Sequence, residues 1–99
     1  MGLDQWLDAE GVLEGLTFRK NYIIHNLAIE HGKREGENVW RLDYQGLLAV
    51  YDSLQLLRRH IEFGRAVDDL VYLHKMCGYI GEFAGKVRED AAITYFINY

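Results

Sequence analysis

Histidine and cysteine are the residues that could most directly do chemistry in this sequence, and they are few. The histidines stand at 25, 31, 60 and 74, and the single cysteine is Cys77. His74 and Cys77 are three residues apart, so on a helix they would share a face, as a thiol–imidazole nucleophile pair requires. Met76 and Ile80 beside Cys77 instead indicate a core position, and scattered histidines do not form a metal site. We therefore expect no metal, no cofactor and no catalytic residues.

The segment TFRKNYIIHN, residues 17–26, gathers polar and aromatic groups around two isoleucines. Thr17 is the expected N-cap of a helix that ends at Gly32. Both sides of this helix are largely apolar, which predicts packing from two directions. The two sides consist of Phe18, Tyr22, His25 and Ile29, and of Lys20, Ile24 and Leu27. We expect His25 to be a partly buried imidazole bonded to a neighbour, with a working acid, base or ligand as the alternative.

The remaining elements follow from periodicity and caps. Strands are expected at 1–8, 39–42 and 91–99, with a loop at 33–38. A second helix is expected from the cap Asp43 to about Phe63, where Gly64 stops it, and a third from about Val67 to about Arg88. The pattern predicts one α+β domain over residues 1–99, with three helices and a small sheet formed by the two ends of the chain. An all-helical domain with irregular termini is the alternative.

Two helix faces lack an obvious covering element. On the second helix, Leu47, Val50, Tyr51, Leu54, Leu57 and Ile61 form a core arc. The opposite strip of Ala49, Leu56, His60 and Phe63 is also apolar, so either the terminal strands or a partner covers it. We expect partner binding at Leu56, Arg59, His60 and Phe63, with Arg19 as a second contact.

The third helix carries three glycines on one face. Gly78, Gly81 and Gly85 share an arc with Val67 and His74. The opposite arc is the expected core face and consists of Leu73, Met76, Ile80, Phe83 and Val87. Because glycine costs helix stability, the close approach of another helix or of a symmetry mate is expected. The excess of apolar helix faces leads us to expect a homodimer.

Composition narrows the class of protein. The net charge is −4, from 15 acidic and 11 basic residues, which argues against a general binder of nucleic-acid phosphates. The opening residues lack a cationic leader and no apolar run reaches membrane-spanning length, so we expect a cytoplasmic protein without membrane contact.

Three segments resemble a group of small bacteriophage proteins of uncharacterised function. The matching residues are MGLD at 1–4, Phe18, Arg19 and Lys20 followed by Ile24 and His25, and VWRLDYQGLLAVY at 39–51. The chain departs from the group at Tyr22, where an asparagine is usual, and at Leu27 and Ala28, where an aromatic pair is usual. The resemblance implies a phage-type binder that blocks or redirects a host machine.

The first expectation is therefore a small non-catalytic phage-type protein that binds a host or defence protein in the host cytoplasm and inhibits it by occlusion, as anti-CRISPR proteins do. The alternative is a modest nucleic-acid-binding protein. It would use Arg19, Lys20, Arg58 and Arg59 for phosphates and Trp40 and Tyr44 for stacking. An enzyme that uses His25 comes third.

Overall fold

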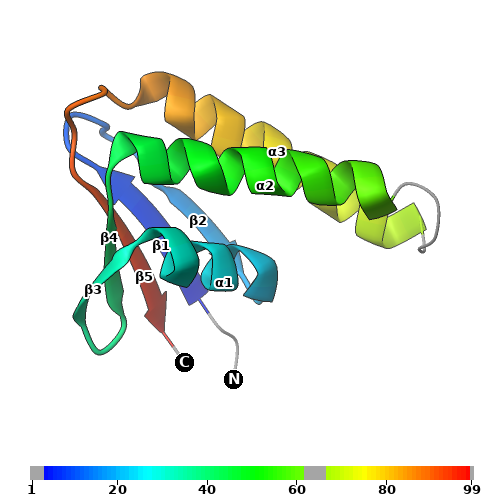
Figure 1. The fold of residues 1–99 in the computed structure, drawn as a ribbon, viewed down its shortest axis with the longest axis horizontal. Coiled ribbons are helices and arrows are strands. Elements are labelled where there is room, and N and C mark those ends of the chain that lie inside the picture. Colours follow the sequence, from blue (N-terminus) through cyan, green and yellow to red (C-terminus); the bar gives the residue numbers. More distant parts are fainter. Residues whose placement is uncertain (1–3, 62–66, 99) are drawn as a thin grey trace.

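The fold is an antiparallel sheet with three helices on one of its faces (Figure 1). The computed structural model describes residues 4–61 and 67–98, and describes side chains in this range except at 60–70. In chain order the elements are β1 (Asp4–Ala9), β2 (Leu16–Arg19), α1 (Tyr22–His31), β3 (Lys33–Gly36), β4 (Val39–Leu42), α2 (Tyr44–Ile61), α3 (Val67–Lys86) and β5 (Ile93–Asn98). None of the described helices is long and apolar enough to cross a membrane.

The sheet has five strands in the order β2-β1-β5-β4-β3, and every neighbouring pair is antiparallel. The predicted α+β class is confirmed, and the all-helical alternative is wrong because both ends of the chain form strands. β1 and β5 lie next to each other in the middle of the sheet and pair from Asp4 opposite Asn98 to Ala9 opposite Ile93. The expected sheet from the two chain ends is thus its central pair.

The first helix begins later than predicted. Residues 16–19 form β2 instead of a helix start, and Asn21, not Thr17, is the N-cap. The Asn21 Oδ1 accepts the Ile24 N–H at 3.0 Å, and Lys20 just before it has a positive φ of 54°. The predicted helix start at Thr17 is wrong because β2 gains hydrogen bonds from β1, and such pairing cannot be predicted from neighbouring residues.

The loop predicted at 33–38 is also wrong in part. Lys33–Gly36 is strand β3, which pairs with β4 at the edge of the sheet. All four of its residues are exposed, so the segment lacks the apolar alternation by which a half-buried strand is recognised. The predicted strand at 39–42 is confirmed, and so is the Asp43 cap, whose Oδ1 accepts the Gly46 N–H at 2.7 Å. The predicted stop at Gly64 lies outside the described residues.

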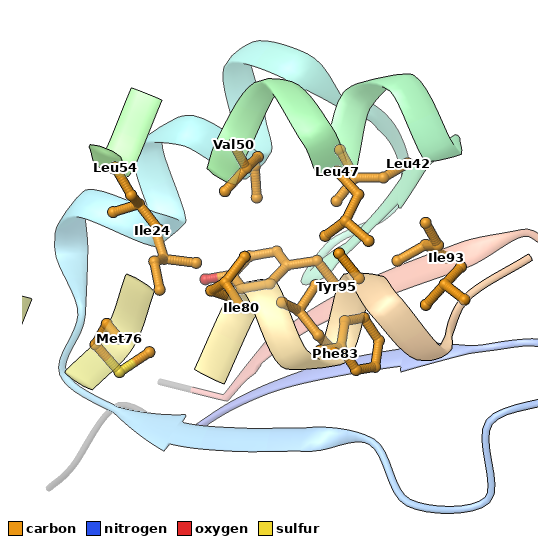
Figure 2. Close-up of a cluster of buried hydrophobic side chains, with 14 of the residues drawn as sticks. Ile24, Leu42, Leu47, Val50, Leu54, Met76, Ile80, Phe83, Ile93 and Tyr95 are labelled. Atoms are coloured by element: carbon orange, nitrogen blue, oxygen red, sulfur yellow. The ribbon is translucent and has the colours of Figure 1, made fainter. Parts of the chain in front are cut away.

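The core lies between the sheet and the helices. From α2 and α3 it receives the predicted arcs, including Leu47, Leu54, Met76 and Ile80, all of which are buried. Figure 2 shows these side chains gathered around Tyr95 of β5. The prediction that α1 is packed from two directions is met in part: Ile24 and Ala28 are buried and His25 is partly buried, but Tyr22 and Ile29 are exposed. Helix α1 contacts α2 and β4.

Candidate binding surface on the open face of the sheet

The sheet face opposite the helices is not covered by any described element (Figure 1). Alternation along each strand decides which side chains lie there. On β5, Ile93, Tyr95 and Ile97 are buried, whereas Phe96 between them is 38% exposed. On β1, Gln5 and Leu7 are buried and Trp6 between them is partly exposed. Trp6 and Phe96 therefore point away from the helices.

Strand register places these outward residues in one row. Trp6 pairs with Phe96 on one side and with Thr17 on the other, and Phe96 pairs with Val39 of β4. Directly opposed residues on one sheet face have their Cβ atoms about 5 Å apart, close enough for the side chains to touch. The row Thr17–Trp6–Phe96–Val39, called here the aromatic row, crosses four strands at the centre of the open face.

Charged residues flank the aromatic row, and the two arginines among them are paired with carboxylates. The Arg19 Nε lies 2.9 Å from Asp4 Oδ1, and the Arg41 Nη1 lies 3.3 Å from Glu35 Oε1. Both pairs are exposed, so each contributes little to stability. These pairs give this part of the surface a mixed charge.

The inner face carries a buried polar network instead. The Asn21 N–H donates to Gln5 Oε1 at 2.7 Å. The Gln5 Nε2 donates to the Asn21 carbonyl at 3.0 Å and to the Tyr95 hydroxyl at 2.7 Å. Because a backbone N–H can only donate, its contact identifies the Gln5 oxygen and so settles the orientation of this amide. The network ties the start of α1 to the two central strands.

His25 belongs to this network, as the expected partly buried imidazole bonded to a neighbour. Its Nδ1 lies 2.9 Å from the Tyr95 hydroxyl, and its ring meets Trp40 edge to face with centroids 5.6 Å apart. Burial lowers the pKa of His25 because desolvation penalises the charged ring. The neutral form with Nδ1 as acceptor fits the donation from Gln5 to Tyr95, since the hydroxyl hydrogen is then directed at His25.

The described residues of the predicted partner surface lie on two elements, Leu56 and Arg59 on α2 and Arg19 on β2. Leu56 is 56% exposed on α2 and Arg59 is exposed nearby, so the terminal strands do not cover that strip. The side chain of His60, and Phe63 as a whole, lie outside the described residues. Arg19 is on β2 in the sheet, and not on a helix beside the others.

The residues predicted to bind nucleic acid come from several elements: Arg19 from β2, Arg58 and Arg59 from α2, and Trp40 from β4. Trp40, chosen for stacking, is 7% exposed and lies on the inner face, with the Arg34 guanidinium over its ring at 5.7 Å. The prediction for Trp40 is therefore wrong. Among the described residues, the aromatic side chains on the open face are Trp6 and Phe96. Strand alternation could have separated Phe96 from Tyr95, but it does not say which of the two faces the helices cover.

The surroundings of His74 and Cys77 do not favour a thiol–imidazole nucleophile pair. Cys77 is buried, and the pKa of its thiol is raised by desolvation, against an opposing influence from Arg58. The Arg58 Nη1 donates to the His74 Nδ1 at 2.9 Å. Among the described residues, no group of three or more His, Cys, Asp and Glu side chains could hold a metal ion.

The glycine face of α3 is only partly explained within the chain. A Cβ on Gly81 would lie 3.2 Å from the Tyr51 ring of α2, so the expected close approach exists there. A Cβ on Gly78 or Gly85 would have nothing within 4 Å. These glycines line an open groove of about 500 Å³ between α2 and α3, together with Tyr44 and Leu48.

Comparison with known proteins identifies no relative: no protein-family model, no curated protein and no solved structure matches the chain.

Proposed function

We propose that this protein is a non-catalytic binder that uses the open face of its sheet to cover a working surface of a host or defence protein and so inhibits it. The observation that carries the proposal is the aromatic row, in which Phe96 lies between Trp6 of β1 and Val39 of β4. Tryptophan and other aromatic residues are enriched in the energetically dominant centres of protein interfaces. Solvent-facing strand positions are otherwise commonly polar.

A protein target fits this face better than a phosphate backbone does. Arg19 and Arg41 flank the aromatic row, and each already has a carboxylate partner. A polar rim of mixed charge around an apolar centre is the usual anatomy of a protein interface. The phage-type context, the anti-CRISPR-like mode of action and the host cytoplasm as location come from the resemblance in the first half of the chain.

The test is a pull-down from bacterial lysate on the immobilised protein, with and without nuclease treatment. The variant Trp6→Thr/Phe96→Thr removes both rings but keeps residues that suit a strand. Leu56→Asp alters the exposed strip of α2 instead. We expect a protein that survives nuclease treatment, and we expect the threonine variant to lose it and Leu56→Asp to retain it. Loss of the target with Leu56→Asp alone would place binding on α2 and refute the role of the open face.

A second candidate is binding of single-stranded nucleic acid, favoured by one observation. Two adjacent aromatic rings on an open sheet can stack with successive bases. The variant Trp40→Phe would leave Trp6 as the single tryptophan and as a fluorescent reporter on the open face. Quenching by an oligonucleotide that weakens steeply with added salt would support this candidate. Unchanged fluorescence at low salt would eliminate it.

A further inference from the structure

Strand β2 forms one edge of the sheet, and its free backbone groups can be identified from the hydrogen-bond pattern. The Ile97 N–H donates to the Asn38 carbonyl at 3.1 Å, on the β4 side of β5. Successive residues of a strand direct their backbone groups to opposite sides. The backbone N–H and C=O groups of Phe96 therefore point toward β1. Trp6, which pairs with Phe96, therefore directs its own backbone groups back toward β5.

The same alternation extends to the edge. Gln5 is next to Trp6 in the strand, so the backbone N–H and C=O groups of Gln5 point toward β2, where Gln5 pairs with Phe18. Thr17 and Arg19 must then direct their N–H and C=O groups outward, away from the sheet. One of these groups has a partner in the chain: the Tyr72 hydroxyl donates to the Arg19 carbonyl, at a long 3.4 Å. No described backbone group pairs with the Thr17 edge.

The opposite edge of the sheet is built differently. Strand β3 carries the charged residues Lys33, Arg34 and Glu35, and its register shifts between Arg34 and Gly36. Charges and bulges are the devices by which proteins prevent pairing at a sheet edge. Strand β2 pairs with β1 in unbroken register from Leu16 to Arg19 and has one charged residue. Of the two edges, β2 is the one that can accept another strand.

Aromatic side chains of α3 lie along this edge. Tyr72 and Tyr79 are 45% and 49% exposed. Tyr72 reaches Arg19 of β2, and Tyr79 lines a small hollow of about 120 Å³ together with Leu16 and Phe83. An incoming strand would find backbone partners on β2 and apolar contacts on α3 above it, the two components of strand-addition recognition.

The charges at this edge are self-complementary. Glu14 lies just before β2 and is exposed, and Lys20 lies just after it and is also exposed. In an antiparallel pair with the two-fold axis at Thr17, Thr17 faces its own copy and Lys20 of each chain faces Glu14 of the other. On the inner side the same register sets Leu16 opposite Phe18. A symmetric interface needs one patch that complements itself, and this edge meets that condition.

We infer that β2 pairs with β2 of a second copy of this chain in this register, which joins the two sheets into one. The sequence also predicted a homodimer, from its apolar helix faces and not from a strand edge. The edge pairing differs because it satisfies the outward groups of Thr17 and exchanges the long Tyr72–Arg19 bond for a backbone bond. The aromatic row of each copy stays uncovered, since strand addition occurs in the plane of the sheet. The inference is independent of the proposed function.

The test is sedimentation equilibrium over a range of protein concentrations. The wild type is expected to be a dimer. Thr17→Pro removes the outward N–H at the axis and is expected to give a monomer, because proline is tolerated on an edge strand but cannot donate. Thr17→Val keeps the N–H and is the matched control, expected to stay dimeric. Circular dichroism of each variant checks that it is folded.

A charge exchange tests the register without altering the backbone. Glu14→Lys and Lys20→Glu are each expected to weaken the dimer about tenfold, because each creates two like-charge contacts across the axis. The double variant restores the opposite charges and is expected to restore the dimer. A monomeric wild type would overturn the inference. So would a dimer that Thr17→Pro leaves intact, or single reversals with no effect.

Discussion

The side-chain amide of Gln5 on β1 donates a hydrogen bond of 2.7 Å to the hydroxyl of Tyr95 on β5, across 90 positions of sequence. Gln5 is 1% exposed, and Tyr95 is fully buried. No buried side-chain nitrogen or oxygen among the described residues lacks a hydrogen-bond partner. A completely satisfied polar network of this kind favours one arrangement of the central strands and α1 over alternatives.

Gln5→Met is therefore expected to lower the free energy of unfolding by about 2–3 kcal/mol. The substitution keeps the side-chain volume but leaves the Asn21 N–H without its acceptor in a dry site. Urea denaturation measures the loss. Asp8→Asn, on an exposed position of the same strand, should change stability by less than about 0.5 kcal/mol. A Gln5→Met protein as stable as the wild type would show that the network is not required.

The free energy of unfolding is expected to decrease as the pH is lowered, because of His25. The unfolded imidazole titrates near 6.5, and burial lowers the pKa of the folded one. The unfolded chain then binds a proton that the folded chain does not, so stability is full above about 6.5 and declines as the pH falls toward the folded pKa.

His25→Gln isolates this effect, since the other histidines are common to both proteins. The difference in unfolding free energy between wild type and variant should shrink as the pH falls below about 6.5. A difference that stays constant from pH 7.5 to pH 5 would contradict the lowered pKa, those two limits being roughly the range over which histidine changes charge.

Alanine at Gly78 and at Gly85 is expected to raise the free energy of unfolding by about 1 kcal/mol each, because the added Cβ has open space and alanine favours the helix. Gly81→Ala should gain less or lose stability, since its Cβ would meet the Tyr51 ring at 3.2 Å. The Tyr51 hydroxyl accepts from Gln55 at 2.6 Å, which resists a shift of the ring. Thermal unfolding of the three variants measures these changes in stability. Equal gains at all three positions would contradict this account.

Lys20→Gly is expected to stabilise the fold by about 1 kcal/mol. Lys20 has φ of 54°, a conformation that costs a residue with a side chain roughly 1–2 kcal/mol and costs glycine much less. Lys33→Gly, which also removes an exposed lysine but from strand β3, should instead destabilise by about 0.5–1 kcal/mol. Chemical denaturation compares the two. Equal effects would mean that the backbone at Lys20 is not strained.

Leu56→Asp is expected to fold with nearly unchanged stability, within about 0.5 kcal/mol, because Leu56 is largely exposed. Leu54→Asp, two residues earlier, should lose more than about 4 kcal/mol, because Leu54 has no exposed surface and the carboxylate would be buried unpaired. Circular dichroism and denaturation measure both. Unfolding of the Leu56→Asp protein would make that strip part of the core.

Features that depend on neighbouring residues could be predicted from the sequence. The 3.6-residue spacing of Leu47, Val50 and Leu54 predicted the core side of α2, Asp43 predicted its start, and the β-branched and aromatic residues at the end of the chain predicted β5. Each rests on an interaction within one turn, or within one strand, that is the same in any fold.

Features that depend on residues far apart in the sequence became visible in the fold alone. Strands β2 and β3 carry weak local signals and exist because β1 and β4 supply their hydrogen bonds. Alternation separates Phe96 from Tyr95, but the helices, packed on one side only, make Tyr95 core and leave Phe96 on the open face. The candidate surface arises in the same way, because register brings Trp6 beside Phe96 from opposite ends of the chain, and register is a property of paired strands that neither segment contains alone.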